Sequence, residues 1–410
     1  MSGSAVVIVG AGPAGLIAAD VLSAHGVKVR LYDQRRSPGR KFTLAGRGGL
    51  NLTHSEPLEE MLDRYGPQRR LLEPAIRAFD ASDLRAWSAD LGEPTIVGTS
   101  GRVFPESFRA TPLLRALMQR LDQQGVEFNF HHRLTAWKKN ADEHVLTFEA
   151  SEPTVNAHTV TAQADIVLFA LGGPSWPRVS SDGSWLSLFS DAGVACAPWA
   201  PANCGLNVEW SDVLIERFAG SPLKNVAVSF HGETVRGDPM ITRTGLEGGP
   251  IYAHSRAVRE ALGDGDTQIE LDLFPDLTPA QLHERLEHKL RRKDSLSSYL
   301  RRKGLDKAKI AVVRDATGNE IDRTPLPLSR LLKAVPVEIV GTSSLDRSIS
   351  AAGGISFDAI DDHFMLTEFP GAFVSGEMID WEAPTGGYLL QATFATAVHA
   401  ANAILARLAH

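Results

Sequence analysis

The start of the chain alternates apolar runs, glycines and small residues in a pattern that predicts a strand, a turn, a helix and a second strand. Residues 5–19 read AVVIVGAGPAGLIAA, and the next apolar run, VKVRLYD, ends at Asp33. Such a βαβ unit within about 30 residues, closed by an acidic residue, is typical of dinucleotide-binding sites. A glycine turn that only helps packing would leave Asp33 unexplained.

Each residue of this motif has a physical role in holding a nucleotide. Gly10 makes the tight turn, Gly12 lets a pyrophosphate approach the backbone, and Gly15 and Ala19 let the helix pack close to the sheet. The helix N-terminus offers free N–H groups and its positive dipole end to the phosphates. Asp33 is placed to accept hydrogen bonds from a ribose 2′-OH.

The remaining periodicity predicts further elements on both sides of a change in composition near residue 196. After a Gly- and Arg-rich loop over 36–54, the pattern predicts helices over 57–92, a hairpin over 95–104, a helix over 111–124, and strands within 126–137, 145–150, 158–163 and 165–173. After the change in composition near residue 196, the pattern predicts short alternating segments over 198–275, charged helices over 278–332, a strand pair over 336–350 and a long helix over 386–408. Short alternating segments are typical of a β-barrel or sandwich.

These elements predict an α/β fold in which a Rossmann-type nucleotide domain is interrupted by insertions. We expect residues 1–195 and 351–410 to form the nucleotide domain, 196–275 with 335–350 a β-barrel-like substrate domain, and 276–334 a helical insert. A chain of 410 residues exceeds one usual hydrophobic core, which agrees with several domains.

Composition and charge favour an enzyme that acts on a small molecule. The chain is 43% hydrophobic and 22% charged, with a formal net charge of −7. A general nucleic-acid binder usually carries a basic face, so no nucleic-acid partner is expected. We interpret one basic cluster as the solvated face of helices: Lys289, Arg291, Arg292, Lys293, Arg301, Arg302 and Lys303.

The two cysteines, Cys196 and Cys204, form no CxxC pair, so a disulfide framework or redox dithiol is not expected. No signal-peptide pattern precedes the first strand, and no apolar run approaches the length of roughly 18 residues that a membrane helix needs. We therefore expect a cytoplasmic protein without a membrane partner. No HExxH, GxSxG or P-loop motif occurs, so no metal is predicted, and acyl or phosphoryl transfer is disfavoured.

Three later segments favour FAD over NAD: GRKFTLAGRGGLNLTH (39–54), DIVLFALGGPSWP (165–177) and PGAFVSGEMIDWEAPTGGYLLQATFATA (370–397). Arg40 and Lys41 follow the second strand and can reach the pyrophosphate or the adenosine. A short strand delivers Glu377, and the glycines at 386–387 open the last helix, whose positive end can stabilise negative charge on reduced flavin. An NAD dehydrogenase has no evident use for this unit. No His or Cys is placed for a covalent flavin link.

With SGRVFPESFRA (100–110) and TRTGLEGGPIY (242–252), these segments resemble the aminoacetone oxidase/BaiN-like (YhiN-like) flavoprotein family, related to the glutathione reductase superfamily. The resemblance implies a GR2-like FAD-binding domain, a β-barrel-like insert and a small helical insert. This sequence departs from the family at Leu50, where many members have Cys, and at Trp176, where Tyr is common. The motifs and the resemblance together predict these FAD contacts: Gly10, Gly12, Pro13, Ala14, Gly15, Asp33, Gln34, Arg40, Lys41, Gly46, Gly48, Asn51, Leu134, Ala170, Leu171, Gly172, Gly173, Gly376, Glu377, Asp380, Gly386, Gly387, Tyr388 and Gln391.

The chemistry left open is oxidation or reduction of a small organic substrate. No second GxGxxG marks a dedicated NAD(P)H domain, and without a cysteine pair disulfide reduction is excluded. We favour slightly an oxidase of a small amine with O2 as acceptor. The alternative is a reductase of conjugated, steroid-like enones, with NAD(P)H as a transient reductant. A hypothesis of another class, an RNA-associated or structural flavoprotein, is disfavoured by the acidic charge.

The catalytic residues are poorly defined by the sequence. The resemblance places five candidate side chains where the insert meets the flavin: Arg243, Tyr252, His254, Trp176 and Tyr388. For each, an ordinary packing, ion-pair or hydrogen-bonding role is favoured. For His54, loop stabilisation is favoured over contact with the flavin edge, whereas for Lys41 the motif favours a cofactor role.

Overall fold

The computed structural model describes residues 5–140, 143–151, 157–263, 265, 267–287 and 295–409. The chain forms two compact units, Met1–Ala200 with Ser350–His410, and Pro201–Ile349. The division therefore lies within a few residues of the change in composition near residue 196. Lys289, Arg291, Arg292 and Lys293 of the basic cluster lie outside the described residues.

The first unit is built on a five-stranded parallel sheet with the order β21-β10-β1-β2-β6. Its strands are β21 (Ala372–Val374), β10 (Ile166–Phe169), β1 (Val6–Val9), β2 (Val29–Tyr32) and β6 (Glu127–Asn129). β1, β10 and β21 are buried at every position, as expected for parallel strands that are covered on both faces. Because β21 pairs with β10, the C-terminal segment returns to the sheet that the N-terminus begins.

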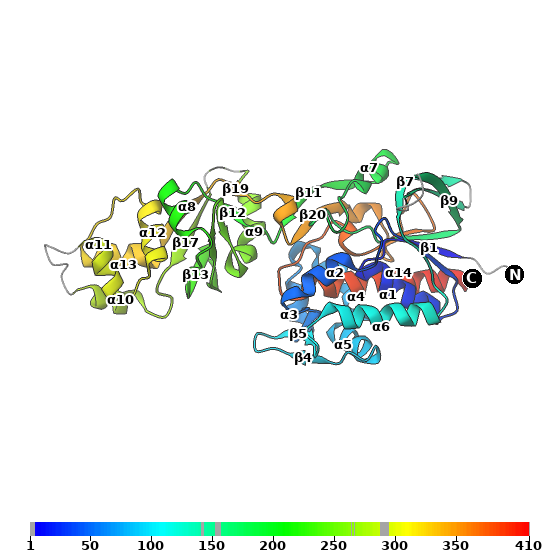
Figure 1. Ribbon diagram of the computed structural model, residues 1–410, viewed down its shortest axis with the longest axis horizontal. Helices are drawn as coiled ribbons and strands as arrows, with labels where there is room; N and C mark the ends of the chain where they lie inside the picture. The colour runs from blue at the N-terminus through cyan, green and yellow to red at the C-terminus, as the bar shows by residue number, and fades with distance from the viewer. Residues whose placement is uncertain are drawn as a thin grey trace. The chain divides into compact units, whose positions relative to one another are not determined.

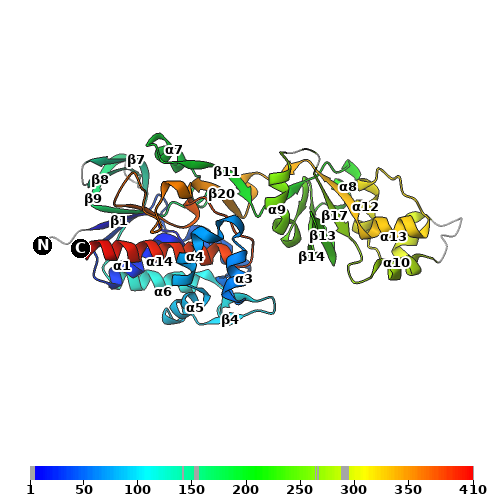
Figure 2. The same cartoon turned by 180° about the vertical axis from the view of Figure 1, so that it is seen from behind.

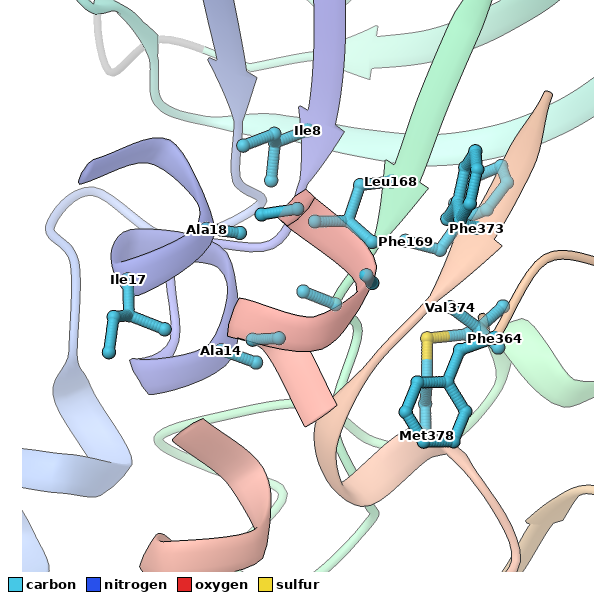
Figure 3. Close-up of a cluster of buried hydrophobic side chains, with 14 of the residues drawn as sticks. Ile8, Ala14, Ile17, Ala18, Leu168, Phe169, Phe364, Phe373, Val374 and Met378 are labelled. Atoms are coloured by element: carbon cyan, nitrogen blue, oxygen red, sulfur yellow. The ribbon is translucent and has the colours of Figure 1, made fainter. Parts of the chain in front are cut away.

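Helices α1 (Pro13–Ala24), α6 (Ala110–Gln123) and α14 (Tyr388–Leu408) pack about this sheet, and α14 runs beside α1 in both views (Figures 1 and 2). Figure 3 shows part of the core, in which Ile8 of β1, Ala14 and Ala18 of α1, and Leu168 and Phe169 of β10 belong to one buried hydrophobic cluster. The small side chains of α1 let α14 pack against it. The expected Rossmann-type fold is confirmed.

Helix α14 has 21 residues and is apolar enough by composition to cross a membrane. The expectation that no apolar run has this length is therefore wrong. Most of its apolar window is buried inside the unit, against α1 and α4 (Arg69–Ala78). A core helix between other helices needs the same all-round apolar composition as a membrane span.

The segment between β2 and β6 carries most of the remaining helices of the first unit. The expected helical stretch contains α3 (Leu58–Asp63), α4 and α5 (Ala81–Asp90), and the expected hairpin is β4 (Thr95–Val97) with β5 (Arg102–Pro105), joined by β3 (Thr53–His54). The loop expected over 36–54 is wrong in part, because Arg40–Ala45 forms helix α2 and Gly46–Gly48 a 3₁₀ turn. Because glycines flank this short helix on both sides, the sequence pattern predicted a loop.

An antiparallel meander and a strand pair complete the unit. β7 (His132–Asn140), β8 (Glu143–Ala150) and β9 (His158–Ala164) pair in order, followed by α7 (Trp185–Asp191). β11 (Cys196–Ala202) pairs with β20 (Ser350–Ile355), where the chain passes between the two units.

The described part of the second unit holds two four-stranded antiparallel sheets and six helices. One sheet has the order β14 (Glu233–Gly237), β13 (Val226–Phe230), β17 (Thr267–Asp272), β18 (Val335–Ile339), and the other β15 (Met240–Thr242), β16 (Gly245–Glu247), β12 (Leu206–Asn207), β19 (Gly341–Thr342). The helices are α8 (Asp212–Phe218), α9 (Gly249–Ala261), α10 (Pro279–Leu286), α11 (Leu296–Arg302), α12 (Lys307–Ala316) and α13 (Pro325–Lys333).

One hydrophobic cluster joins these strands and helices. Val228 and Leu271 of the sheet belong to the same buried cluster as Leu282, Leu300 and Leu328 of the helices. The described helices within 276–334 therefore share a buried core with the strands of the second unit.

Candidate active site

The glycine turn after β1 leaves one open position beside the start of α1. Gly10 has φ 114°, and a Cβ there would collide with the carbonyl of Ala170, while a Cβ on Gly15 would collide with the carbonyl of Gly10. At Gly12, by contrast, no heavy atom of the described residues lies within 4 Å of the Cβ direction. The Gly12 N-cap position offers no side chain to cap the N-terminus of α1. Gly10 and Gly15 thus allow the turn and the helix to pack closely. Gly12 leaves free space in front of the unsatisfied N–H groups of the helix N-terminus, as a pyrophosphate requires.

Asp33 ties the end of β2 to this turn. Its Oδ2 accepts the N–H of Ala11 at 2.7 Å and its Oδ1 accepts the N–H of Arg35 at 2.6 Å. Burial raises the pKa of Asp33 above its ordinary value, although both backbone hydrogen bonds favour the ionised form. Since each carboxylate oxygen has a second lone pair, the carboxylate keeps acceptor capacity for a ribose hydroxyl.

Four buried polar atoms of the cofactor segments have no hydrogen-bond partner among the described residues. They are Asn51 Oδ1, Ser175 Oγ, Ser375 Oγ and Glu377 Oε1. A buried polar atom without a partner costs about 1–3 kcal/mol, so each of these atoms is a candidate position for a hydrogen bond to a polar ligand. The ribityl hydroxyls and ring edges of FAD supply suitable donors and acceptors, and the residues therefore fit this group. Sequence reasoning missed Ser175 and Ser375, although both lie inside the quoted motifs.

An ion pair joins two of these segments. Lys41 Nζ lies 2.6 Å from Glu377 Oε2, and a Cβ on Gly173 would lie 3.4 Å from the Glu377 carboxyl carbon. Gly376, with φ 73°, donates its N–H to Thr396 Oγ1 at 3.0 Å, and its Cβ direction faces Ala14 at 3.0 Å. The GEMID segment is thereby held beside the start of α1 and brings Glu377 to the nucleotide site.

Other predicted contacts take varied positions around this centre. At Gly48 and Gly172 the Cβ direction is open to 4 Å as far as the described residues go, whereas Gly46 packs against Ala110. Asp380 accepts the N–H of Gly353 at 3.0 Å. The others differ in burial, with Pro13, Gln34, Arg40, Leu171 and Gly386 half-buried and Ala14, Leu134 and Ala170 buried.

The side-chain amide of Gln391 is hydrogen-bonded within the protein at both ends. The residue is fully buried, its Nε2 donates to the Phe79 carbonyl at 2.8 Å, and its Oε1 accepts from Thr53 Oγ1 at 2.7 Å. These bonds link α14 to β3 and to the C-cap residue of α4, and the predicted cofactor contact of Gln391 stays a prediction. Gly387 is required for a related reason, because a Cβ there would lie 2.6 Å from the Thr53 carbonyl and because its φ is 102°.

A polar cluster surrounds the first residue of α14. The Tyr388 phenol hydrogen-bonds Glu56, and Arg64 Nη2 lies 2.7 Å from Glu56 Oε2. Tyr65 donates its hydroxyl to the Tyr388 carbonyl at 2.8 Å. Burial and the bond to Glu56 raise the pKa of Tyr388 well above its ordinary value. Burial alone would raise the pKa of Glu56, but the bonds from Arg64 and Tyr388 lower it overall. At neutral pH the cluster thus pairs a protonated phenol with an ionised carboxylate.

His54 holds a loop of this cluster in place. Its ring stacks on Tyr388 with 5.4 Å between centroids. The Glu56 N–H donates to Nδ1 at 3.2 Å, so Nε2 carries the proton and donates to the Ser100 carbonyl at 3.0 Å. These bonds agree with the loop-stabilising role that we favoured. Glu56 and Arg64 carried no motif and become visible only in the folded chain.

The candidates of the second unit have mainly structural surroundings. His254 is buried, bonds the Val228 carbonyl at 3.0 Å, and has its pKa lowered by burial. Tyr252 is half-buried, which raises its pKa, and Arg243 is exposed. Their catalytic roles stay predictions. In the first unit, Trp176 is exposed and has φ 56°.

Comparison with known proteins identifies the family. The model of the HI0933-like protein Rossmann domain matches residues 4–403. The chain belongs to the HI0933-like family. Members and relatives of this family are flavoproteins, and the protein is an FAD-dependent oxidoreductase, which confirms the predicted family and enzyme class.

Two curated relatives match the HI0933-like chain over nearly its whole length. The 3-dehydro-bile acid delta(4,6)-reductase of Clostridium scindens is 24% identical and aligns over 98% of each chain. The ribosomal RNA dihydrouridine synthase of Escherichia coli is 21% identical, again over 98% of each chain. Among solved structures, the Sdh1 complex of Mycobacterium smegmatis in the apo form has a TM-score of 0.53 at 15% identity, covering 99% of this chain and 68% of that one, which supports the fold.

Proposed function

We propose that this protein reduces a carbon–carbon double bond conjugated to a carbonyl group in an apolar, polycyclic ketone. The observation that carries the proposal is the alignment, over 98% of both chains, with a relative named as a 3-dehydro-bile acid delta(4,6)-reductase. The second relative is named for dihydrouridine, in which the ring double bond conjugated to a carbonyl is reduced. The two names describe different substrates but one kind of reaction.

The reaction balances as the addition of a hydride and a proton across the double bond. The hydride would pass from reduced FAD to the carbon β to the carbonyl, a proton from water would go to the α carbon, and the cofactor would be left oxidised. NAD(P)H, or another two-electron donor, then restores reduced FAD. When bound, FAD supplies the hydride, and the carbonyl makes the β carbon electrophilic.

The residues of the chain bind and orient the reacting groups in this proposal. The turn at Gly10–Gly12 and the start of α1 would hold the pyrophosphate, and Glu377 with Lys41 would hold the ribityl chain through the free Oε1. The N-terminus of α14, where Gly387 offers no capping side chain, would face the flavin and favour its anionic reduced form.

This choice replaces the oxidation of a small amine that the sequence slightly favoured. No comparison supports an amine substrate or O2 as acceptor, whereas one of the two full-length relatives named above is called a reductase and the other is named for a reduced product. Uridine in RNA is the second candidate substrate, supported by the dihydrouridine relative. The net charge of −7 favours the apolar ketone over RNA.

The test is anaerobic turnover of the purified yellow protein. The flavin is reduced with NADPH, NADH or dithionite and mixed with 4-androstene-3,17-dione, 2-cyclohexenone, a uridine-containing RNA or buffer. We expect the two enones to reoxidise the flavin and the product to gain two hydrogen atoms by mass spectrometry. Reoxidation by RNA alone would move the assignment to the second candidate. Bleaching of oxidised flavin by aminoacetone, with no enone reaction, would restore the oxidase.

A further inference from the structure

Two aromatic residues of the first unit combine a strained backbone with an exposed ring. Phe108 has φ 57° and is 48% exposed, and Trp176 has φ 56° and is 43% exposed. The left-handed region is unfavourable for bulky side chains. Phe364 shares this conformation, with φ 60°, but is 3% exposed, so core packing offsets its strain. For Phe108 and Trp176, burial offers no such offset.

The backbone bonds at these positions do not need an aromatic ring. The Phe108 carbonyl accepts the N–H of Leu50 at 3.0 Å, and the Trp176 carbonyl accepts the N–H groups of Val179 at 3.0 Å and Ser180 at 3.2 Å. Glycine would make the same bonds in the same conformation with less strain. These backbone hydrogen bonds therefore do not explain why an aromatic side chain stands at either position.

Trp176 lies in a turn that carries a buried polar atom without a partner among the described residues. It directly follows Ser175, whose buried hydroxyl has no partner among the described residues. Three residues earlier, Gly173 packs against the Glu377 carboxyl group. The turn follows the carboxyl end of β10, which is the edge of a parallel sheet where ligands bind.

Phe108 is joined to another cofactor segment. Its carbonyl bonds Leu50, and Asn51 next to it carries a buried oxygen that has no partner in the described part of the chain. The ring lies 5.4 Å from that of Phe104, and its edge lies 3.6 Å from the Cβ direction of Gly49. Both exposed rings thus border segments that fit FAD.

We propose that Phe108 and Trp176 are substrate contacts that select flat, apolar, polycyclic ketones. The inference rests on the proposed function and deepens it by assigning the residues that recognise the hydrocarbon part of the substrate. An exposed aromatic ring gains free energy when an apolar surface covers it, and a ring held by a rigid backbone loses little entropy on binding. The unpartnered polar atoms hold the cofactor, and the two rings contact the apolar part of the substrate.

The test compares the selectivity of Trp176→Ala and Phe108→Ala with that of Leu71→Ala. Leu71 lies on helix α4 and is 44% exposed, so it is a control for loss of an exposed apolar side chain. For each variant, kcat/KM is measured with 4-androstene-3,17-dione and with 2-cyclohexenone, together with FAD content. We expect the steroid-to-cyclohexenone ratio of kcat/KM to fall about tenfold in each site variant, mainly through KM for the steroid, and to stay constant in the control.

A second variant separates recognition from folding. Trp176→Gly relieves the strain at φ 56°, so we expect an equal or higher Tm with the same loss of steroid selectivity. Unchanged selectivity, equal losses on both substrates, or loss of FAD from the site variants would overturn the proposal.

A binding measurement distinguishes failure of this inference from failure of the proposed function. If the wild type reduces neither enone, the proposed function fails, and equilibrium dialysis of a saturated 3-oxo steroid against wild type and Trp176→Gly still decides the inference. Weaker binding by the variant supports it, whereas equal binding, or no binding to the wild type, overturns it.

Discussion

Lys41 and Glu377 form an ion pair of 2.6 Å although 336 positions separate them in the chain. Lys41 lies on α2 and Glu377 follows β21, so the pair joins the N-terminal and the C-terminal segments of the first unit. It uses one oxygen of Glu377 and leaves the other buried without a partner among the described residues. This relationship points to a ligand between the two segments and motivates the first prediction.

Replacement of Glu377 by Gln should weaken FAD binding without preventing folding. Gln keeps the shape of the side chain but removes the negative charge. That charge pairs with Lys41 and strengthens the hydrogen bond that the carboxylate accepts from the cofactor. A hydrogen bond to a charged group is worth about 1.5–3 kcal/mol, so we expect the Kd of FAD to rise about ten- to a hundredfold. The measurement is titration of apoprotein with FAD. Asp63→Asn, which removes an exposed partner of Arg69, is the control and should leave the Kd unchanged. An unaltered Kd in Glu377→Gln would remove this residue from the site.

Gly12→Val and Gly10→Ala should separate cofactor binding from packing. Gly12 has φ −82° and open space, so a valine fits the apoprotein but fills the position of the pyrophosphate. Gly10 has φ 114° and faces the Ala170 carbonyl, so even alanine is strained. We expect Gly12→Val to keep the Tm of the apoprotein and to lose the yellow colour, and Gly10→Ala to lose stability. A yellow Gly12→Val protein would contradict the pyrophosphate site.

Asp33→Ala should lower both FAD affinity and the stability of the apoprotein. The substitution removes the acceptor for the N–H groups of Ala11 and Arg35 as well as the predicted ribose contact. We expect the Kd of FAD to rise about ten- to a hundredfold, with a lower apoprotein Tm. Asp33→Asn is the control, because it keeps an acceptor oxygen and should lose less stability. A lower Tm with an unchanged Kd would leave Asp33 a structural role only.

The cofactor should be FAD held without a covalent bond. The fitted site offers hydrogen bonds and an ion pair, and no His or Cys is placed by motif for a flavin link. Acid precipitation should release the yellow colour, and the released compound should co-migrate with FAD. Colour that stays in the pellet would contradict non-covalent binding.

Stability should fall as the pH drops below about 6.5, in part through His144. This residue is buried, accepts from Trp137 Nε1 at 3.2 Å and bonds the Pro370 carbonyl at 3.2 Å, and burial lowers its pKa. Because the unfolded chain binds the proton more readily than the folded one, the free energy of unfolding decreases as pH falls through the unfolded pKa.

Urea unfolding between pH 7 and pH 5 checks the role of His144. His144→Gln should show a smaller loss of stability over this range than the wild type. An identical slope in His144→Gln and wild type would assign the pH dependence to other groups.

Local patterns along the chain determine much of the secondary structure of this protein. The strand, glycine turn and helix at residues 5–24 and the strand ending before Asp33 are contiguous, so periodicity and glycine placement are enough to predict them. The C-terminal motif likewise predicts the strand before Gly376 and the helix at Tyr388–Leu408. Where glycines flank a short element, as at Arg40–Ala45, the local signal is misleading.

The tertiary structure alone decides which distant residues meet. Gln391 matches a cofactor motif, yet its side chain bonds Thr53 and the Phe79 carbonyl, because the packing of α14 carries it into the interior. The bond between Glu56 and Tyr388 likewise joins segments with no shared sequence pattern. A helix or strand follows from interactions within a few residues, whereas burial, partner choice and pKa depend on the order of strands in the sheet and on the chain that covers them.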